Sequence, residues 1–341
     1  MNKIEQNHRR TVGIMAGVLL ICILASFTLG RYPVSLGELL GVMGARLGLP
    51  VTPFWTSQVE AAVWNIRLPR VVLSVLVGCC LSAAGASYQG VFQNPMASPD
   101  ILGASAGAGF GAALAILLGA SSVGITVGAF AASLLTVALV FTVSRHARGD
   151  RVLGLVLAGI MVSSLFQSGT SFLKLVADPN NQLPQITYWL MGSLSGAKWA
   201  DIGFVLIPML AGLIPLFLLR WQLNVITMGD DEARAMGVNA PKIRLWIVIC
   251  STLVTASAVS VSGMIGWVGL VIPHMTRRLV GSDYRFLMPA SMLGGGIFLL
   301  IVDNVSRNAT TAGIPIGILT AFIGAPFFLL LIMGKGDHYE H

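Results

Sequence analysis

Long apolar segments run through the whole sequence, and they constrain its fold more than any other feature. A helix of about 20 apolar residues is long enough to cross a bilayer core about 30 Å thick. About ten such segments can be recognised, with approximate limits 11–30, 69–91, 101–119, 122–144, 152–176, 200–219, 244–262, 263–276, 286–305 and 313–333. The seventh and eighth are barely separated and are compatible with one broken element. We therefore predict an all-α polytopic membrane protein with about ten transmembrane helices.

The composition agrees with a chain that is surrounded by lipid. Hydrophobic residues make up 55% of it and charged residues only 10%, which is more apolar surface than a water-soluble domain can bury. The net charge of +7 would suggest a nucleic-acid partner for a soluble protein, but cytoplasmic loops of membrane proteins are rich in Lys and Arg. About two thirds of the 21 Lys and Arg residues lie on one side if the N-terminus is cytoplasmic. Both termini are therefore predicted to be cytoplasmic, and no nucleic-acid partner is expected.

The longest outer segment and the two halves of the chain complete the predicted architecture. Residues 31–66 contain an amphipathic stretch from Leu36 to Leu47, so they are expected to lie at the outer membrane interface. With about five spans in each half, the second half would run inverted relative to the first, which is a common plan of transporters. The whole chain, 1–341, is predicted to be one transmembrane domain.

Motifs of enzymes and of ion-driven carriers are missing from the sequence. There is no G-x-x-x-x-G-K-[ST] phosphate loop, so the chain is not expected to be an ATPase or another enzyme. The four cysteines lack metal-binding spacing, and neither a metal nor a cofactor is expected in this chain. Carboxylates are scarce in the spans; Asp303, with Arg307 four residues later, is predicted to form a helical ion pair. An ion-gradient-driven secondary transporter needs ionisable groups or broken helices at the midplane, and that class is kept as the alternative.

Two arginines, Arg67 and Arg70, flank Pro69 at the predicted outer end of the second span. Their stems could lie along lipid while the guanidinium groups reach water. They could also dock carboxylates of an external protein, because a guanidinium binds a carboxylate through two parallel hydrogen bonds. The residues alone favour neither explanation.

A rigid link follows the second span. The segment from Gln89 to Asp100 holds Pro95 and Pro99, which prevent a continuous helix. Ser98 or Asp100 is expected to cap the next helix. The link would lie at the cytoplasmic end, where it is suited to act as a gate.

A polar stripe marks the fifth span. Its members recur at intervals of three and four residues and therefore share one helix face. They are Ser163, Ser164, Gln167, Ser168, Ser171 and Lys174. Polar side chains that face lipid are costly, so this face must meet either another helix or water. We favour a wet path for a substrate over hydrogen bonding between helices.

The largest cytoplasmic loop, about 220–243, contains helix start and stop signals. Asp230 is expected to cap a short helix that has further acidic residues in its first turn. Gly237 is expected to end this helix in a left-handed conformation. Asn239 and Pro241 would start a second short helix. Two capped helices would form a compact knob suited to contacting a partner protein.

Together, these segments resemble the FecCD family of ABC importer permeases, which includes cobalamin, haem and iron-siderophore permeases. The matching segments run in family order from about residue 65 to residue 330 and are specific as a set. They are Arg67-Leu-Pro-Arg70, Asn94-Pro95 with Ser98-Pro99-Asp100, Leu102-Gly103, Gly229-Asp-Asp-Glu-Ala-Arg-Ala-Met-Gly237, Gly266-Trp-Val-Gly-Leu-Val-Ile-Pro-His274, Ile314-Pro-Ile-Gly317 and Gly324-Ala-Pro326.

The resemblance implies the architecture of a type II ABC importer permease in a bacterial inner membrane. It implies a second permease subunit, expected to be an identical copy in a homodimer, and two cytoplasmic ATPases that use ATP and Mg. It also implies a periplasmic or lipid-anchored substrate-binding protein. The expected cargo is a metal chelate, with an iron(III)-siderophore expected before haem or cobalamin.

The resemblance also assigns roles to particular residues. Arg67, Arg70 and Arg307 match arginines that receive acidic residues of the binding protein. The cytoplasmic gate is matched by Asn94, Pro95 and Met96, with Met in place of the more usual Leu. The ATPase-coupling segment is matched by Gly229, Asp230, Asp231, Glu232, Ala233, Arg234, Ala235, Met236 and Gly237. The polar stripe, Ser163, Ser164, Gln167, Ser168 and Ser171, fits the translocation path.

Overall fold

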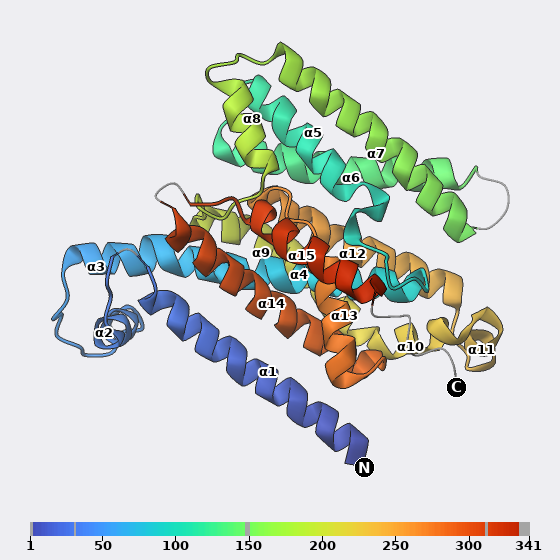
Figure 1. The fold of residues 1–341 in the computed structure, drawn as a ribbon, viewed down its shortest axis with the longest axis horizontal. Coiled ribbons are helices and arrows are strands. Elements are labelled where there is room, and N and C mark those ends of the chain that lie inside the picture. Colours follow the sequence, from blue (N-terminus) through green and yellow to red (C-terminus); the bar gives the residue numbers. More distant parts are fainter. Residues whose placement is uncertain (1–2, 31, 147–150, 311–312, 334–341) are drawn as a thin grey trace.

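The computed structural model describes residues 3–30, 32–146, 151–310 and 313–333, and every regular element in these ranges is a helix. Most long helices lie along one common direction, as in a bundle that crosses a membrane (Figure 1). In chain order the elements are α1 (Lys3–Thr28), α2 (Leu36–Arg46), α3 (Ser57–Ala61), η1 (Ala62–Arg67), α4 (Leu68–Val91), η2 (Pro99–Leu102), α5 (Ala104–Leu117), α6 (Ser122–Ser144), α7 (Arg151–Val176), α8 (Gln182–Leu190), α9 (Trp199–Leu218), α10 (Arg220–Met228), α11 (Asp230–Ala235), α12 (Ala240–Ser262), α13 (Val268–Val280), α14 (Tyr284–Ala309) and α15 (Ile316–Met333).

The fold confirms the prediction of an all-α membrane protein. Each predicted apolar segment corresponds to a helix. Within the described ranges, seven helices are long and apolar enough to cross a membrane, namely α1, α4 with its N-terminal extension, α6, α7, α9, α12 and α14. The remaining three segments correspond to α5, α13 and α15, whose apolar parts are shorter. Short helices are tolerated at membrane depth where the surrounding protein satisfies their free backbone groups.

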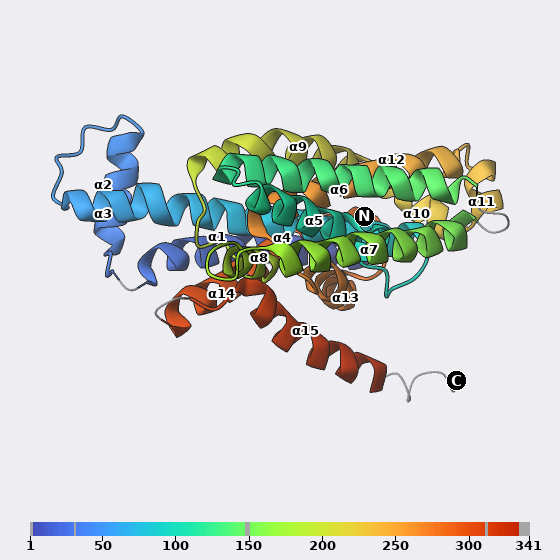
Figure 2. The same ribbon diagram turned by 90° about the horizontal axis from the view of Figure 1, so that it is seen from above.

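The second span begins earlier than predicted. α3, the π-helical η1 and α4 form one helix over Ser57–Val91, so the end of the predicted interfacial segment is part of a span. We attribute the wide π-helical turn to Pro69, whose ring and missing N–H do not fit a regular α-helical turn. The amphipathic helix α2 forms as predicted, and a capping box between Ser35 and Glu38 fixes its start. α2 lies across the direction of the long helices (Figure 2).

The seventh and eighth predicted segments are two separate helices. α12 ends at Ser262, and the chain then passes through Gly263 with φ +68° and Trp267 with φ +70°. A left-handed residue cannot continue a right-handed helix. The next helix begins only at Val268 and continues to Val280, so the predicted limits of the eighth segment are wrong.

α4 lies at the centre of the bundle, where it packs against α14, α12 and α13. Glycines allow two of these contacts to be very close. A Cβ atom at Gly78 would lie 2.2 Å from the Gly295 carbonyl oxygen, and one at Gly85 would lie 1.8 Å from the Gly269 carbonyl oxygen. Backbones can approach this closely only where a side chain is absent. α4 therefore forms a fixed axis between the two ends of the bundle.

Candidate functional site

Two short helices, α10 and α11, form a knob at the end of the bundle where α1 begins (Figure 1). α10 buries three side chains, Leu223, Val225 and Ile226. α11 buries only Ala233, and its side chains Asp231 and Arg234 are 95% and 82% exposed. The predicted coupling segment is therefore an ordered surface that rests on a buried base.

An ion pair between Asp230 and Arg244, at 2.6 Å, fastens α11 to α12. The hydrogen bond from Arg244 lowers the pKa of Asp230, so the pair stays charged at neutral pH. The prediction that Asp230 caps α11 is wrong: Gly229 precedes the helix with φ +132°, and Asp230 is its first residue. The carboxylate is engaged by Arg244 instead of by the amides of the first turn.

The end of α11 agrees with the prediction. Gly237 has φ +75°, and its amide donates to the Arg234 carbonyl at 3.0 Å. Asn239 also acts as a cap, since its side chain accepts a hydrogen bond from the Lys242 amide at 3.1 Å. The helix that it starts is the long α12, however, so the predicted second short helix is wrong and α10 takes that place in the knob.

The link after α4 is attached directly to the knob. The side-chain amide of Gln93 donates to the Ile226 carbonyl of α10 at 3.1 Å. Gln93 has φ +47°, a conformation that costs a non-glycine residue about 1 kcal/mol or more. The predicted gate residues follow at once; all three are exposed, and the Met96 amide donates to the Asn94 side chain at 2.9 Å. A movement of α10 would therefore pull on the segment that holds Asn94, Pro95 and Met96.

The entry to α5 differs from the prediction. Neither Ser98 nor Asp100 caps this helix; it begins after Gly103, which has φ +74°. The Asp100 carboxylate accepts a hydrogen bond from the hydroxyl of Ser105, the second residue of α5. Both side chains line a mostly apolar cavity of about 680 Å³, whose other walls come from the end of α8, the loop before α13, and α15. The cavity lies next to the gate link and is large enough for a small ligand.

The polar stripe of α7 lies on the exposed side of the single chain. Ser164, Gln167, Ser168 and Ser171 are exposed, and Ser163 is half-buried. The hydroxyls of Ser164 and Ser171 donate to carbonyls of their own helix, at 2.9 and 3.0 Å. Such bonds reduce the cost of a hydroxyl in an apolar environment without requiring water. The apolar neighbours Leu165 and Phe172 are exposed as well, so exposure in one chain does not distinguish a path from a lipid-facing surface.

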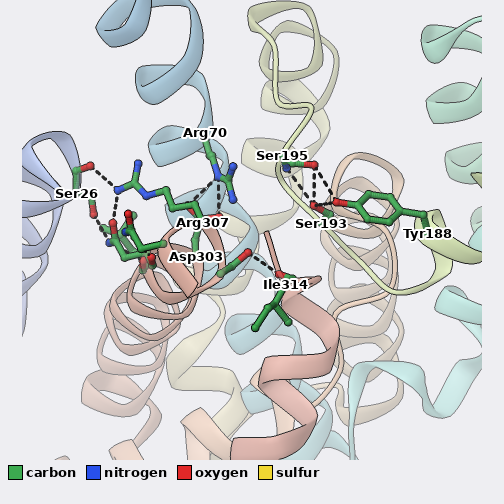
Figure 3. A network of polar contacts seen from close by, with 12 residues as sticks. Ser26, Arg70, Tyr188, Ser193, Ser195, Asp303, Arg307 and Ile314 are labelled. Carbon is green, nitrogen blue, oxygen red and sulfur yellow. Dashed lines mark hydrogen bonds and ion pairs between the residues drawn. The ribbon is translucent and has the colours of Figure 1, made fainter. Parts of the chain in front are cut away.

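The three arginines assigned to docking lie at the opposite end, where α1, α4 and α14 meet. Figure 3 shows two of them, Arg70 and Arg307. Arg67 is only 6% exposed and donates to the carbonyls of Phe27 and Tyr32. Arg307 donates to the Ser26 carbonyl and to the Asn304 side chain. In the single chain these groups therefore connect α1 to the two central helices.

Arg70 forms the ion pair that the sequence analysis gave to Arg307. Its Nε lies 2.9 and 3.1 Å from the two carboxylate oxygens of Asp303. The Asp303 side chain is fully buried and that of Arg70 is 12% exposed. The predicted pair within α14 is therefore wrong, because the carboxylate points across to α4 and is already occupied there.

Sequence analysis missed a hydroxyl cluster near this end of the bundle. The Tyr188 hydroxyl lies 3.5 Å from Ser193 Oγ and 3.3 Å from Ser195 Oγ (Figure 3). These hydrogen bonds lower the pKa of Tyr188. The cluster lines a cavity of about 260 Å³ that also includes Gln185 and Lys198. The sequence offered little signal, since a Tyr and two Ser residues in a short loop are typical of ordinary turns.

A long helical bundle with a projecting knob at one end and little polar surface between its ends has the architecture of an ABC transporter permease. The chain belongs to the FecCD transport family, which matches residues 18–334. A solved structure described as an inward-facing conformation of a metal-chelate type ABC transporter superposes with a TM-score of 0.85 at 35% identity, covering 96% of this chain and 99% of that one.

Permeases that are named for their cargo resemble the chain over most of its length. The molybdate import system permease protein MolB of Haemophilus influenzae is 37% identical, covering 92% of this chain and 93% of its own. The hemin transport system permease protein HmuU of Yersinia pestis is 38% identical, with coverages of 86% and 91%. The cobalamin import system permease protein BtuC of Halobacterium salinarum is 36% identical, with coverages of 94% and 95%. The chain is thus an ABC importer permease for metal chelates in the broad sense.

Proposed function

We propose that two copies of this chain form the pore of a bacterial inner-membrane importer that carries an iron(III) chelate, such as a siderophore complex. The knob, α10 and α11, would face the cytoplasm and bind a separate ATPase subunit that uses ATP and Mg. The opposite end, with α2 and α3, would face a periplasmic or lipid-anchored substrate-binding protein. Both termini would then be cytoplasmic, since α1 begins at the knob end of the bundle and α15 runs toward that end (Figures 1 and 2).

The observation that carries this proposal is the contact between the knob and the gate link. Gln93 binds Ile226 of α10 directly before Asn94, Pro95 and Met96. A force that an ATPase applies to the knob would reach the gate through one hydrogen bond and the buried base of α10. A carrier driven by an ion gradient has no need of such a lever, and the buried carboxylate of Asp303 is paired at one end of the bundle.

The cargo is a proposal that rests on the relatives. Permeases for hemin, cobalamin and molybdate resemble the chain to a similar degree, and permeases for an iron chelatin and for Fe(3+)-citrate do so as well. Three of these five cargoes contain iron. We therefore propose an iron(III)-siderophore first, with haem and cobalamin as the next candidates.

Transport in proteoliposomes tests the function. The permease is reconstituted with its ATPase and binding protein, and uptake of a ferric siderophore, haem, cobalamin and molybdate is compared. We expect uptake of an iron chelate, and we expect this uptake to require ATP on the side of the membrane where the knob lies. Uptake that follows a proton or sodium gradient without the ATPase would refute the proposal and support a secondary transporter.

Cysteine labelling is expected to distinguish the two sides of the exposed face of α7. Single cysteines at Ser164, Ser168 and Ser171 should react with a water-soluble thiol reagent in the assembled transporter, because this side would line the path. Leu165 and Phe172 lie on average some 80° around the helix axis from these serines. Cysteines at these two positions should therefore react at least about tenfold more slowly. The native cysteines are first replaced by Ala or Ser. Equal reactivity at all five positions, in every nucleotide state, would identify the stripe as a packing surface.

A further inference from the structure

A groove opens at the knob end of the bundle, on the side away from the gate link. Its walls come from the start of α1, the junction of α9 and α10, and the start of α14. It encloses a cavity of about 610 Å³, which is within the range of ligand sites. The walls are mainly apolar, with a cluster of arginines among them: Arg9, Arg220 and Arg285.

The charges of this groove are not balanced within the described chain. Arg285 is neutralised by Asp283 at 2.7 Å and by Glu5 at 3.3 Å. Neither Arg9 nor Arg220 forms an ion pair with any residue that the structure describes. Two guanidinium groups, one on α1 and one at the start of α10, therefore remain available for an anion.

Arg220 is held in place at the mouth of the groove. Its guanidinium donates to the Phe217 carbonyl at 2.9 Å, and its central carbon lies 4.0 Å from the centre of the Phe217 ring. Because the stacked ring already holds the guanidinium in place, the Arg220 side chain would lose little conformational freedom when a ligand binds. Arg9 is exposed on α1, one turn after Glu5, which Arg285 anchors.

The position of the groove indicates the depth of its ligand in the membrane. The groove is built from the terminal turns of three spanning helices, α1, α9 and α14, so it lies at the level of the lipid headgroups. Trp221, which lines it, is half exposed, as is common for aromatic residues at this level. Further into the membrane, Leu20 of α1 and Ile214 of α9 are exposed on the faces that carry Arg9 and Leu218.

We propose that the groove binds an anionic phospholipid, with its phosphate between Arg9 and Arg220 and its acyl chains along α1 and α9. An arginine pair recognises the charge, and the apolar walls recognise the rest of the molecule. Basic sites between spanning helices bind acidic lipid headgroups in this way. A free phosphate ion would leave the apolar walls in contact with water, so it fits the groove less well.

Lipid titration of the purified, delipidated permease tests the proposal. Binding of phosphatidylglycerol and phosphatidylcholine is measured by native mass spectrometry for the wild type and for Arg9→Gln/Arg220→Gln. Each basic residue near a membrane surface contributes about 1 kcal/mol. We therefore expect the double variant to bind phosphatidylglycerol about 25-fold more weakly, with unchanged binding of phosphatidylcholine. The single variants should each lose about fivefold, so the result does not depend on the double variant alone.

The chain offers a matched control at the same end of the bundle. Arg10 and Arg278 are exposed and lie outside the groove, so Arg10→Gln/Arg278→Gln changes the net charge equally and should keep full phosphatidylglycerol binding. An equal loss in this control would show that the affinity comes from general surface charge. Equal binding of both lipids by the wild type would also overturn the proposal. If millimolar inorganic phosphate displaces phosphatidylglycerol, the groove is a simple anion site and the lipid proposal is overturned.

Discussion

Replacing Gly237 by proline is expected to abolish ATP-driven transport while the membrane-spanning helices remain folded. Gly237 ends α11 with φ +75°, and its amide donates to the Arg234 carbonyl at 3.0 Å. Proline requires a φ near −65° and has no N–H, so it removes this bond and forbids this turn, at a local cost of about 3 kcal/mol. The change would disorder the surface that carries Asp231 and Arg234, where we propose that the ATPase binds.

The measurement is copurification of the ATPase with the permease, followed by uptake in proteoliposomes. Gly48 provides a matched control at the other end of the bundle: it follows α2 with φ +82°, and its amide donates to the Ala45 carbonyl at 3.1 Å. Gly48→Pro should damage its own turn in the same way and still retain the ATPase. Gly237→Ala should retain more of it than Gly237→Pro, because alanine keeps the amide N–H and a Cβ atom would meet nothing within 4 Å, so that only the left-handed φ is strained, by about 1 kcal/mol. Undiminished copurification and transport in Gly237→Pro would refute the coupling assignment.

The link between Gln93 and α10 explains how such a surface defect could stop transport in the bundle. α10 rests on the buried side chains Leu223 and Ile226 and binds Gln93 through the Ile226 carbonyl. Gln93 holds a left-handed conformation that is costly for a residue with a side chain. A segment held in such a conformation by its neighbours can change shape when those neighbours move. We therefore propose that the knob and the gate link move together.

The fold was largely predictable because apolar length and helix signals are local properties of the sequence. Helix α2 and the left-handed end at Gly237 both follow from residues that lie within a few positions of them. The predicted helix limits and caps were wrong mainly where a contact with a residue far away in the sequence determines them. The start of the second span is an exception, because the π-helical turn that carries the helix back to Ser57 directly precedes Pro69 and is a local feature. Asp230 would normally cap a helix, yet Arg244 of α12 engages its carboxylate.

The arrangement of the candidate sites was less predictable, because it depends on which helices become neighbours. Asp303 and Arg307 have the spacing of a helical ion pair, and nothing in the local sequence reveals that Arg70 lies across the bundle. The contact of Gln93 with Ile226 spans more than a hundred residues of sequence and involves a backbone carbonyl, which leaves no trace in the residue type. The hydroxyl cluster of Tyr188 is similarly assembled by a turn.

Removing the Asp303 carboxylate alone is expected to destabilise the permease strongly. Asp303→Leu would leave the Arg70 guanidinium, 12% exposed, without its partner in a largely apolar environment. Removing one member of a buried ion pair typically costs about 3–5 kcal/mol, whereas replacing both members by apolar residues is often neutral. We therefore expect a clearly lower melting temperature in detergent for Asp303→Leu, and a smaller loss for Arg70→Met/Asp303→Leu, which leaves no unpaired Arg70 but still removes the carboxylate that faces Arg307. Equal instability of the single and double variants would show that the pair contributes through packing and not through its charges.

The double variant also provides a sharper test of docking than glutamate substitutions would. A glutamate at Arg67 would place a carboxylate against the carbonyls of Phe27 and Tyr32 and would disturb the fold by itself. Arg70→Met/Asp303→Leu removes one proposed docking cation together with the carboxylate that it is paired with. If Arg70 receives a carboxylate of the binding protein, association should slow severalfold at low salt and less at high salt, because rim charges act mainly on the association rate. A complex that forms at the normal rate and affinity, at both low and high salt, would assign Arg70 to bracing α4 against α14 and would leave docking to other residues.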